Sequence, residues 1–187
     1  MPLSKARRVL ADDHVALDKL QGQLKSALRV GDIEATISRL DMFWSRLAVH
    51  IRAEHRQLFP AVIDALTVSS RSQTFAPTLT EARSTIEKLR SDHDFFMHEL
   101  GQAFKILRAL SYEDRETFDR GMNSVRSTMI EIEKRFVIHN QLEETKIYAW
   151  TTTILDTQEQ TDLATRIRIE LANGPPRFAL DEWTTPP

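Results

Sequence analysis

The chain has 187 residues, of which 41% are hydrophobic and 28% are charged, a composition that suits one globular domain. Its formal net charge of −2 provides no positive field to attract nucleic acid or an anionic membrane. Cysteine is absent, which excludes disulfides, thiolate nucleophiles, zinc ribbons and iron–sulfur clusters held by Cys.

The first part of the chain predicts two long amphipathic helices. Apolar residues recur at spacings of three, four and seven and predict a helix at about 3–30. Asp32 follows a Gly and is a candidate N-cap for a second helix at about 32–59. Pro60 is expected to end or kink this helix. The polar stretch 69–74 is expected to form an exposed loop.

The second part repeats this pattern. Apolar residues alternate spacings of three and four without a slip and predict helices at about 78–110 and 113–150. Residues 111–114 between them indicate a turn with capping potential. A shorter fifth helix is expected at about 157–171, followed by an irregular tail.

Four long amphipathic helices with mostly short connections favour an all-α fold, an up-down-up-down four-helix bundle. We expect the bundle to comprise residues 1–155. Residues 156–187 would then form the short C-terminal helix and tail, packed on the bundle.

Each of the four main helices places one histidine on or beside its apolar stripe, and two of them add a glutamate one turn later. An ionised carboxylate buried without a partner is very costly, so two such glutamates need a common explanation. Residues four apart share one helix face, so each His-x3-Glu pair points at one spot. Two metal ions would supply the compensating charge, on His14, His50, Glu54, His93, His139 and Glu143.

The candidate ligands also repeat along the chain. Asp13-His14 recurs 79 residues later as Asp92-His93. The His50-x3-Glu54 pair recurs 89 residues later, at His139 and Glu143. Two similar helical hairpins packed about a pseudo-twofold axis would place equivalent ligands around a dinuclear site.

Together with Leu58-Phe59-Pro60, these motifs resemble the hemerythrin family in its HHE cation-binding form, over roughly residues 5 to 150. The resemblance implies a hemerythrin-like fold and a non-heme centre of two Fe ions with an oxo or hydroxo bridge. The four histidines would be terminal ligands, and Glu54 and Glu143 would bridge the irons. Zinc or manganese is the alternative, because His and carboxylate ligands do not select a metal sharply.

The chain departs from the oxygen-carrying members of that family. Met97 stands where the carriers have a further histidine, and His98 lies one residue too far round the helix. The carriers also place the fourth-helix carboxylate five residues after its histidine, which here is Glu144. We prefer Glu143 because it copies the Glu54 geometry. Fewer histidines leave open metal positions, which favours reaction with O2, peroxide or nitric oxide over stable O2 carriage.

Several neighbouring residues have two interpretations. His55 and His98 are expected at the flank or surface, or alternatively as ligands or outer partners. Asp13 and Asp92 are expected to face solvent or to cap, with a hydrogen bond to a ligating histidine as the alternative. Tyr148 is expected to pack, or to donate to bound oxygen. The dry wall of a small-molecule pocket is predicted at Phe43, Leu47, Phe96, Met97 and Phe136.

Three functions follow from these features. The first is a di-iron protein that binds, senses or reacts with O2, peroxide or nitric oxide. The second is an iron-responsive interaction module without turnover, and the third is an enzyme that degrades peroxide or donates iron in repair. The redox or protein partner stays open. The N-terminal ten residues lack a secretory pattern and no stretch reaches the ~18 apolar residues of a membrane span, so we expect a cytoplasmic protein.

Overall fold

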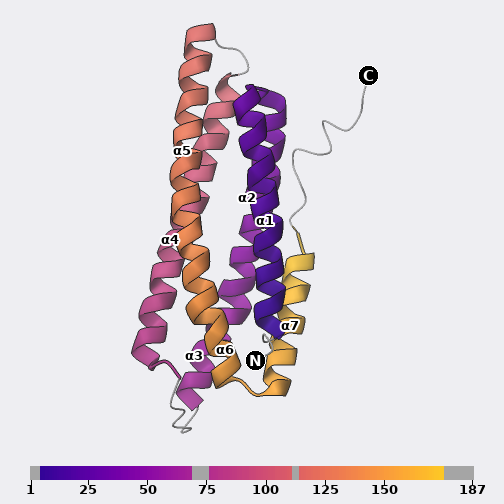
Figure 1. Cartoon of the computed structure of the whole chain (residues 1–187), viewed down its shortest axis with the longest axis vertical. Coiled ribbons are helices and arrows are strands. Elements are labelled where there is room, and N and C mark those ends of the chain that lie inside the picture. Colours follow the sequence, from indigo (N-terminus) through magenta and orange to yellow (C-terminus); the bar gives the residue numbers. More distant parts are fainter. Residues whose placement is uncertain (1–4, 69–75, 111–113, 175–187) are drawn as a thin grey trace.

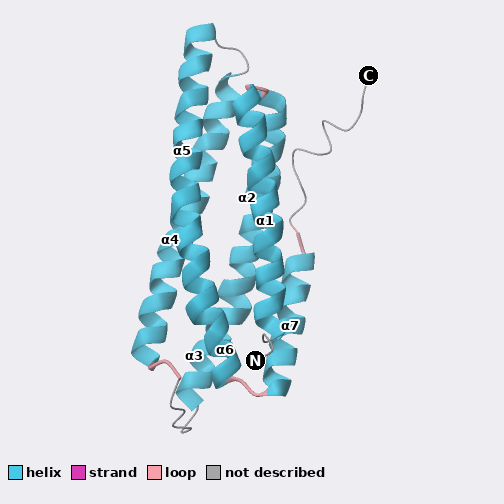
Figure 2. Cartoon of the chain, viewed as in Figure 1, coloured by secondary structure: helices cyan, strands magenta, loops and turns pink. Residues whose placement is uncertain are grey.

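The computed structural model describes residues 5–68, 76–110 and 114–174. Within these ranges the chain is almost entirely helical and contains no strand (Figure 2), so the predicted all-α class is confirmed. The elements are α1 (Lys5–Val30), α2 (Ile33–Ala53), the π-helical turn η1 (Glu54–Leu58), α3 (Phe59–Val68), α4 (Leu79–Ala109), α5 (Arg115–Leu142), the π-helical turn η3 (Glu143–Ile147), α6 (Tyr148–Ile154) and α7 (Thr157–Ala172).

The long helices α1, α2, α4 and α5 lie side by side along the long axis of the molecule (Figure 1). The helix α3 continues α2, and α6 continues α5, at the same end of the structure as the start of α1. The additional helix α7 packs on α1, α2 and η1 through the buried residues Leu163, Ala164 and Ile167. The predicted tail from residue 175 lies outside the described residues, as does the loop at 69–74.

Side-chain caps and one glycine define where the helices begin and end. Gly31 has a φ of +79°, a left-handed conformation that favours glycine, and it ends α1. The Asp32 carboxylate accepts a hydrogen bond from the Ala35 backbone N–H at 2.9 Å, which confirms it as the N-cap of α2. Asp114 caps α5 in the same way. Gly31 and Asp32 alone connect α1 to α2, so this connection is short and the two helices are neighbours.

The predicted end of the second helix at residue 59 is wrong. The helix passes through η1 and continues as α3 to Val68. In η1 the Phe59 backbone N–H bonds the Glu54 carbonyl, five residues back rather than four. Pro60 lies in the first turn of α3, where its missing N–H and fixed φ are tolerated. The same turn recurs as η3, and the fourth helix runs on to Ile154 rather than to residue 150.

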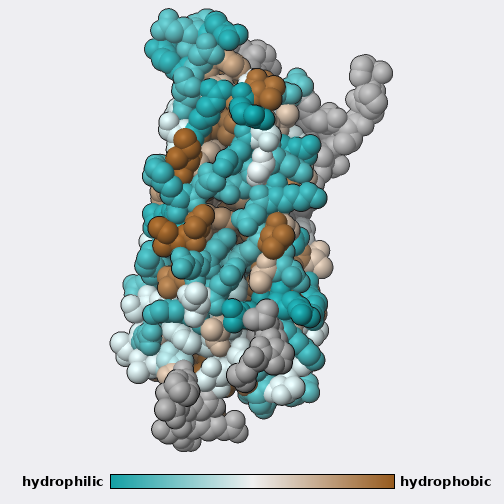
Figure 3. Space-filling view, viewed as in Figure 1, coloured by the Kyte–Doolittle hydropathy of each residue, from teal (hydrophilic) through white to brown (hydrophobic). Residues whose placement is uncertain are grey.

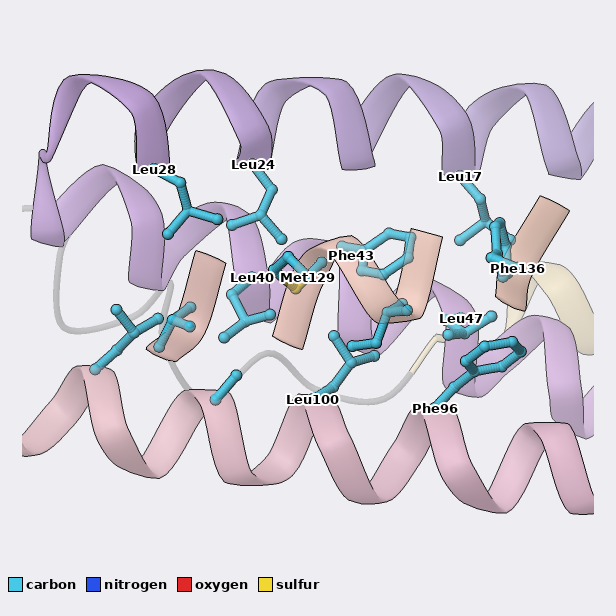
Figure 4. Close-up of a cluster of buried hydrophobic side chains, with 14 of the residues drawn as sticks. Leu17, Leu24, Leu28, Leu40, Phe43, Leu47, Phe96, Leu100, Met129 and Phe136 are labelled. Carbon is cyan, nitrogen blue, oxygen red and sulfur yellow. The ribbon is translucent and has the colours of Figure 1, made fainter. Parts of the chain in front are cut away.

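The interior has two apolar clusters with a polar layer between them. One cluster joins Leu17, Phe43, Leu100 and their neighbours on α1, α2, α4 and α5 (Figure 4). The other includes Leu10 and residues of α3, α6 and α7. Buried histidines and glutamates fill the layer between these clusters, so the fold shields that layer from solvent at both ends.

The visible face of the molecule is mainly hydrophilic, with separate hydrophobic spots (Figure 3). Exposed apolar side chains of the described residues include Val15, Ile130, Val137 and Ile138. Among the described helices, none is both long and apolar enough to cross a membrane.

Candidate metal site

Four buried histidines enter the polar layer, one from each long helix. His14 comes from α1, His50 from α2, His93 from α4 and His139 from α5. Their Nε2 atoms all lie near the same two carboxylates, Glu54 and Glu143. The structure therefore brings together all six residues that the sequence proposes as ligands.

The two glutamates connect one pair of histidines to the other. Glu54 Oε1 lies 3.6 Å from His50 Nε2, while its Oε2 lies 3.3 Å from His93 Nε2. Glu143 Oε2 lies 3.2 Å from His14 Nε2, while its Oε1 lies 2.9 Å from His139 Nε2. Each carboxylate thus presents one oxygen to the His14–His50 half of the site and the other to the His93–His139 half.

Unsatisfied atoms in this layer fit a cation. His50 Nε2, Glu54 Oε2 and Glu143 Oε1 are buried and make no well-aligned hydrogen bond among the described residues, although each lies 2.9 to 3.6 Å from a histidine or glutamate of the layer. Leaving such groups unpaired costs free energy, more for charged groups than for neutral ones. The donors that can hold one ion lie within 4.8 Å of one another, in two groups that share Glu143. This donor set of imidazole and carboxylate suits iron, zinc or manganese.

Each of the four histidines has a side-chain partner at its Nδ1 atom, while its Nε2 atom faces the glutamates. Asp13 Oδ2 lies 2.8 Å from His50 Nδ1, and Asp92 Oδ2 lies 3.4 Å from His139 Nδ1. An Nδ1–H that donates to a carboxylate leaves the Nε2 lone pair free to bind a metal. Both aspartates are buried, so the expectation that they face solvent or cap is wrong.

Basic residues in turn hold these aspartates. Arg46 donates to Asp13, and Arg135 donates to Asp92 at 2.6 Å. Lys88 also reaches Asp92 Oδ2 at 3.1 Å. Burial would raise the pKa of both aspartates, but the contacts with His50 and His139, together with those from Arg46 and Arg135, lower it, so both stay ionised.

The other two histidines have different partners. Glu144 Oε1 lies 3.1 Å from His14 Nδ1, and His55 Nε2 lies 2.9 Å from His93 Nδ1. Glu144 therefore lies behind a histidine, while the Glu143 carboxylate faces the shared centre. His98 is exposed and outside both groups of candidate ligands.

Tyr148 belongs to the site, although the sequence favours packing for it. Its O–H donates to Glu54 Oε1 at 2.7 Å and lies 3.2 Å from both Glu143 Oε2 and His14 Nε2. All three of these atoms belong to the His14–His50 half. A π-helical turn brings the residue five positions on over the same face, so η3 turns Tyr148 toward the layer that Glu143 enters.

Aromatic and aliphatic side chains close the layer toward the first apolar cluster. Phe96 meets the His139 ring edge-on at a centroid distance of 5.2 Å, and Phe136 stacks on it at 6.4 Å. Phe43 and Leu47 are fully buried in the same cluster. Met97 is half-buried at its margin and supplies no donor to the candidate metal groups. These are the five residues that the sequence proposes as the dry wall of a small-molecule pocket, and that role stays a prediction.

Contacts between charged groups in the layer shift the pKa values in the direction opposite to the effect of burial. Burial lowers the pKa of His50, but Glu54 and Asp13 outweigh it and raise that pKa to about 10. Burial likewise opposes the charge on His139, yet Glu143 and Asp92 raise its pKa to about 9. Burial would raise the pKa of Glu143, but contact with His139 and other histidines holds it well below the usual range. The carboxylates are therefore ionised, with protonated His50 and His139 beside them in the metal-free protein; a bound metal ion would take over that positive charge.

The fold and the site define a helical bundle protein with a buried candidate cation-binding site of histidines and glutamates. The family model for the hemerythrin HHE cation-binding domain matches residues 5–151, and the chain belongs to this family. The matched range contains all six candidate ligands and ends before α7. No curated protein and no solved structure gave a match to the chain.

Proposed function

We propose that this chain is a hemerythrin-like di-iron protein that binds, senses or reacts with O2, peroxide or nitric oxide. The proposal includes an up-down-up-down order of α1, α2–α3, α4 and α5–α6, with α7 as an addition. It also includes two iron ions joined by an oxo or hydroxo group. The observation that carries it is the arrangement of Glu54 and Glu143, which each present one oxygen to each pair of histidines.

The number of donors favours a reactive centre over a storage site. Each half offers two imidazoles and one oxygen from each carboxylate. With a bridging oxygen, five donors serve a metal that prefers six. The two irons would supply redox chemistry with a small oxidant, and Met97 stands where the carriers add a histidine.

Tyr148 makes the two halves unequal. Burial and the two nearby carboxylates hold its pKa well above the usual range, so its O–H stays protonated. It is a hydrogen-bond donor on the His14–His50 half, and the corresponding residue of the first repeat is Phe59. We expect the small ligand to react on the half that has this donor, because a phenol can stabilise developing negative charge there.

The test is spectroscopic. Protein loaded with ferrous iron is mixed separately with O2, hydrogen peroxide and nitric oxide, and charge-transfer absorption is recorded; zinc-loaded protein is the control. A response to at least one ligand in the iron form alone supports the proposal. If the absorption of the iron form changes with none of the three ligands, the proposal is contradicted. Large stabilisation by iron without any spectral response would favour the iron-responsive module.

A further inference from the structure

A cleft between α1 and α5 opens at the surface and reaches one residue of the candidate metal site, His14. Its volume is about 530 Å³, and His14 and Glu144 line one end. Near the other end, Lys25 and Glu133 form an ion pair at 2.6 Å. Of the six candidate ligands only His14 lines the cleft, so a molecule bound there lies beside the part of His14 that Glu144 contacts.

Two buried polar atoms on the cleft residues have no partner. Gln21, which is 7% exposed, and Asn140 both line the cleft. The donor Gln21 Nε2 and the acceptor Asn140 Oδ1 make no hydrogen bond within the described part of the chain. A buried polar group without a partner is destabilising, so these side chains fit a guest that both donates and accepts.

The internal repeat shows that this opening is specific to one side of the molecule. The spacing of 79 residues that relates His14 to His93 relates Gln21 to Leu100, and the spacing of 89 relates Asn140 to Ile51. Leu100 and Ile51 belong to the apolar core between α2 and α4. The polar pair therefore replaces an apolar pair only where the cleft is open.

A tryptophan fills the corresponding groove between α2 and α4. Trp44 corresponds to Glu133 in the repeat, and its ring would lie 3.6 Å from a Cβ added to Gly101. The counterpart of Gly101 is Gly22, where an added Cβ would meet nothing within 4 Å. The two grooves thus have the same glycine, but only one has a side chain that closes it.

We propose that the α1–α5 cleft admits and binds a small hydrogen-bonding molecule, hydrogen peroxide, on its way to the His14–His50 half. Gln21 donates to this molecule and Asn140 accepts from it. Dioxygen and nitric oxide are weak hydrogen-bonding partners and gain little from two buried amides, whereas peroxide both donates and accepts. The assignment rests on the proposed function, whose small ligand it narrows to peroxide.

Three substitutions separate access from binding. Glu133→Trp places a tryptophan where the corresponding groove has Trp44 and is designed to close the cleft. Glu133→Gln is its matched control, because it removes the Lys25 ion pair but leaves the cleft open. Gln21→Leu copies Leu100 and removes the donor without closing the cleft. Helical content and thermal unfolding are measured for each variant to establish that it is folded.

The first readout needs no turnover. In zinc-loaded protein, which has no redox chemistry, peroxide is titrated while NMR records the side-chain amide signals of Gln21 and Asn140. The chain has no cysteine to consume the peroxide. The signals are expected to shift saturably in the wild type and in Glu133→Gln, and not in Glu133→Trp. Signals that do not respond to peroxide in the wild type mean that the cleft holds water only and overturn the proposal.

The second readout uses iron-loaded protein mixed with peroxide or nitric oxide by stopped flow. Gln21→Leu is expected to slow the peroxide response about tenfold, the value of one hydrogen bond to a buried group, and to leave the nitric oxide response unchanged. Glu133→Trp is expected to slow both responses. If the wild type responds to neither peroxide nor nitric oxide, the proposed function is refuted. If the wild type responds but all the variants respond at the same rate, only the proposal of the access cleft is refuted.

Discussion

Metal uptake by this protein is expected to release protons, and the number released depends on how many of the candidate histidine ligands are protonated beforehand. Although burial opposes it, Glu54 and Asp13 raise the pKa of His50 to about 10, and Glu143 and Asp92 raise that of His139 to about 9. Both imidazoles are therefore protonated in the metal-free protein at neutral pH. Each must lose its proton before Nε2 can bind a metal, so we expect at least about two protons released per chain.

The same two groups give metal affinity and metal-free stability opposite pH dependences. With about two protons displaced, the metal affinity should rise about a hundredfold per pH unit up to about pH 9. Both folded pKa values lie above the unfolded value of 6.5. The stability that these imidazolium groups add is therefore complete below about pH 6.5 and is lost as pH rises through about 9 to 10.

Zinc is a suitable probe because it has no redox chemistry. Calorimetric titrations in two buffers with different protonation enthalpies give the protons released, and competition with a chelator at several pH values gives the affinity. His98→Ala, which removes an exposed histidine, is the control and should match the wild type. An affinity that does not depend on pH, with no proton released, would refute this reasoning.

Four further substitutions have expected outcomes. Asp92→Asn should weaken metal affinity by about 10–100-fold, measured by chelator competition, because an amide is a poorer partner for a ligating imidazole; an unchanged affinity would mean that the contact is only structural. Tyr148→Phe should lower the free energy of unfolding of the metal-free protein by about 1–2 kcal/mol in urea, because buried carboxylates lose a donor; a gain in stability would argue against this. Gly22→Ala should raise the free energy of unfolding by about 1 kcal/mol, because alanine favours a helix and the added Cβ meets open space. Gly121→Ala should gain less stability or lose stability, because its added Cβ would lie 2.5 Å from Leu110 Cδ2. Equal gains at the two glycines would show that the Leu110 contact costs nothing.

Helical periodicity was sufficient to predict which residues meet in the polar layer. His14, His50, His93 and His139 lie on or beside stripes of buried apolar residues, and packing those stripes together brings the polar members together as well. The short caps were also predictable, because Asp32 has a local partner only three residues away. These features depend on spacing along one helix.

The features that the sequence did not predict depend on contacts between helices or on backbone geometry. Asp13 lies one residue before His14, yet its partner is His50 on the neighbouring helix, and no spacing within α1 indicates that contact. The π-helical turns leave no distinct propensity signal, so the sequence favours packing for Tyr148 and does not indicate its hydrogen bonds to the two glutamates. The repeat offered a clue, because Tyr148 takes the place of Phe59, which stacks on His93.

The central claim is that two metal ions share these six side chains, and metal content tests it most directly. The protein is purified without chelators, reconstituted with ferrous iron and desalted, and its iron is counted. We expect about two irons per chain in the wild type and in His98→Ala, and fewer than about one in Glu143→Ala, which removes the carboxylate that belongs to both groups of candidate ligands. A Glu143→Ala protein that keeps the wild-type iron content would contradict the account.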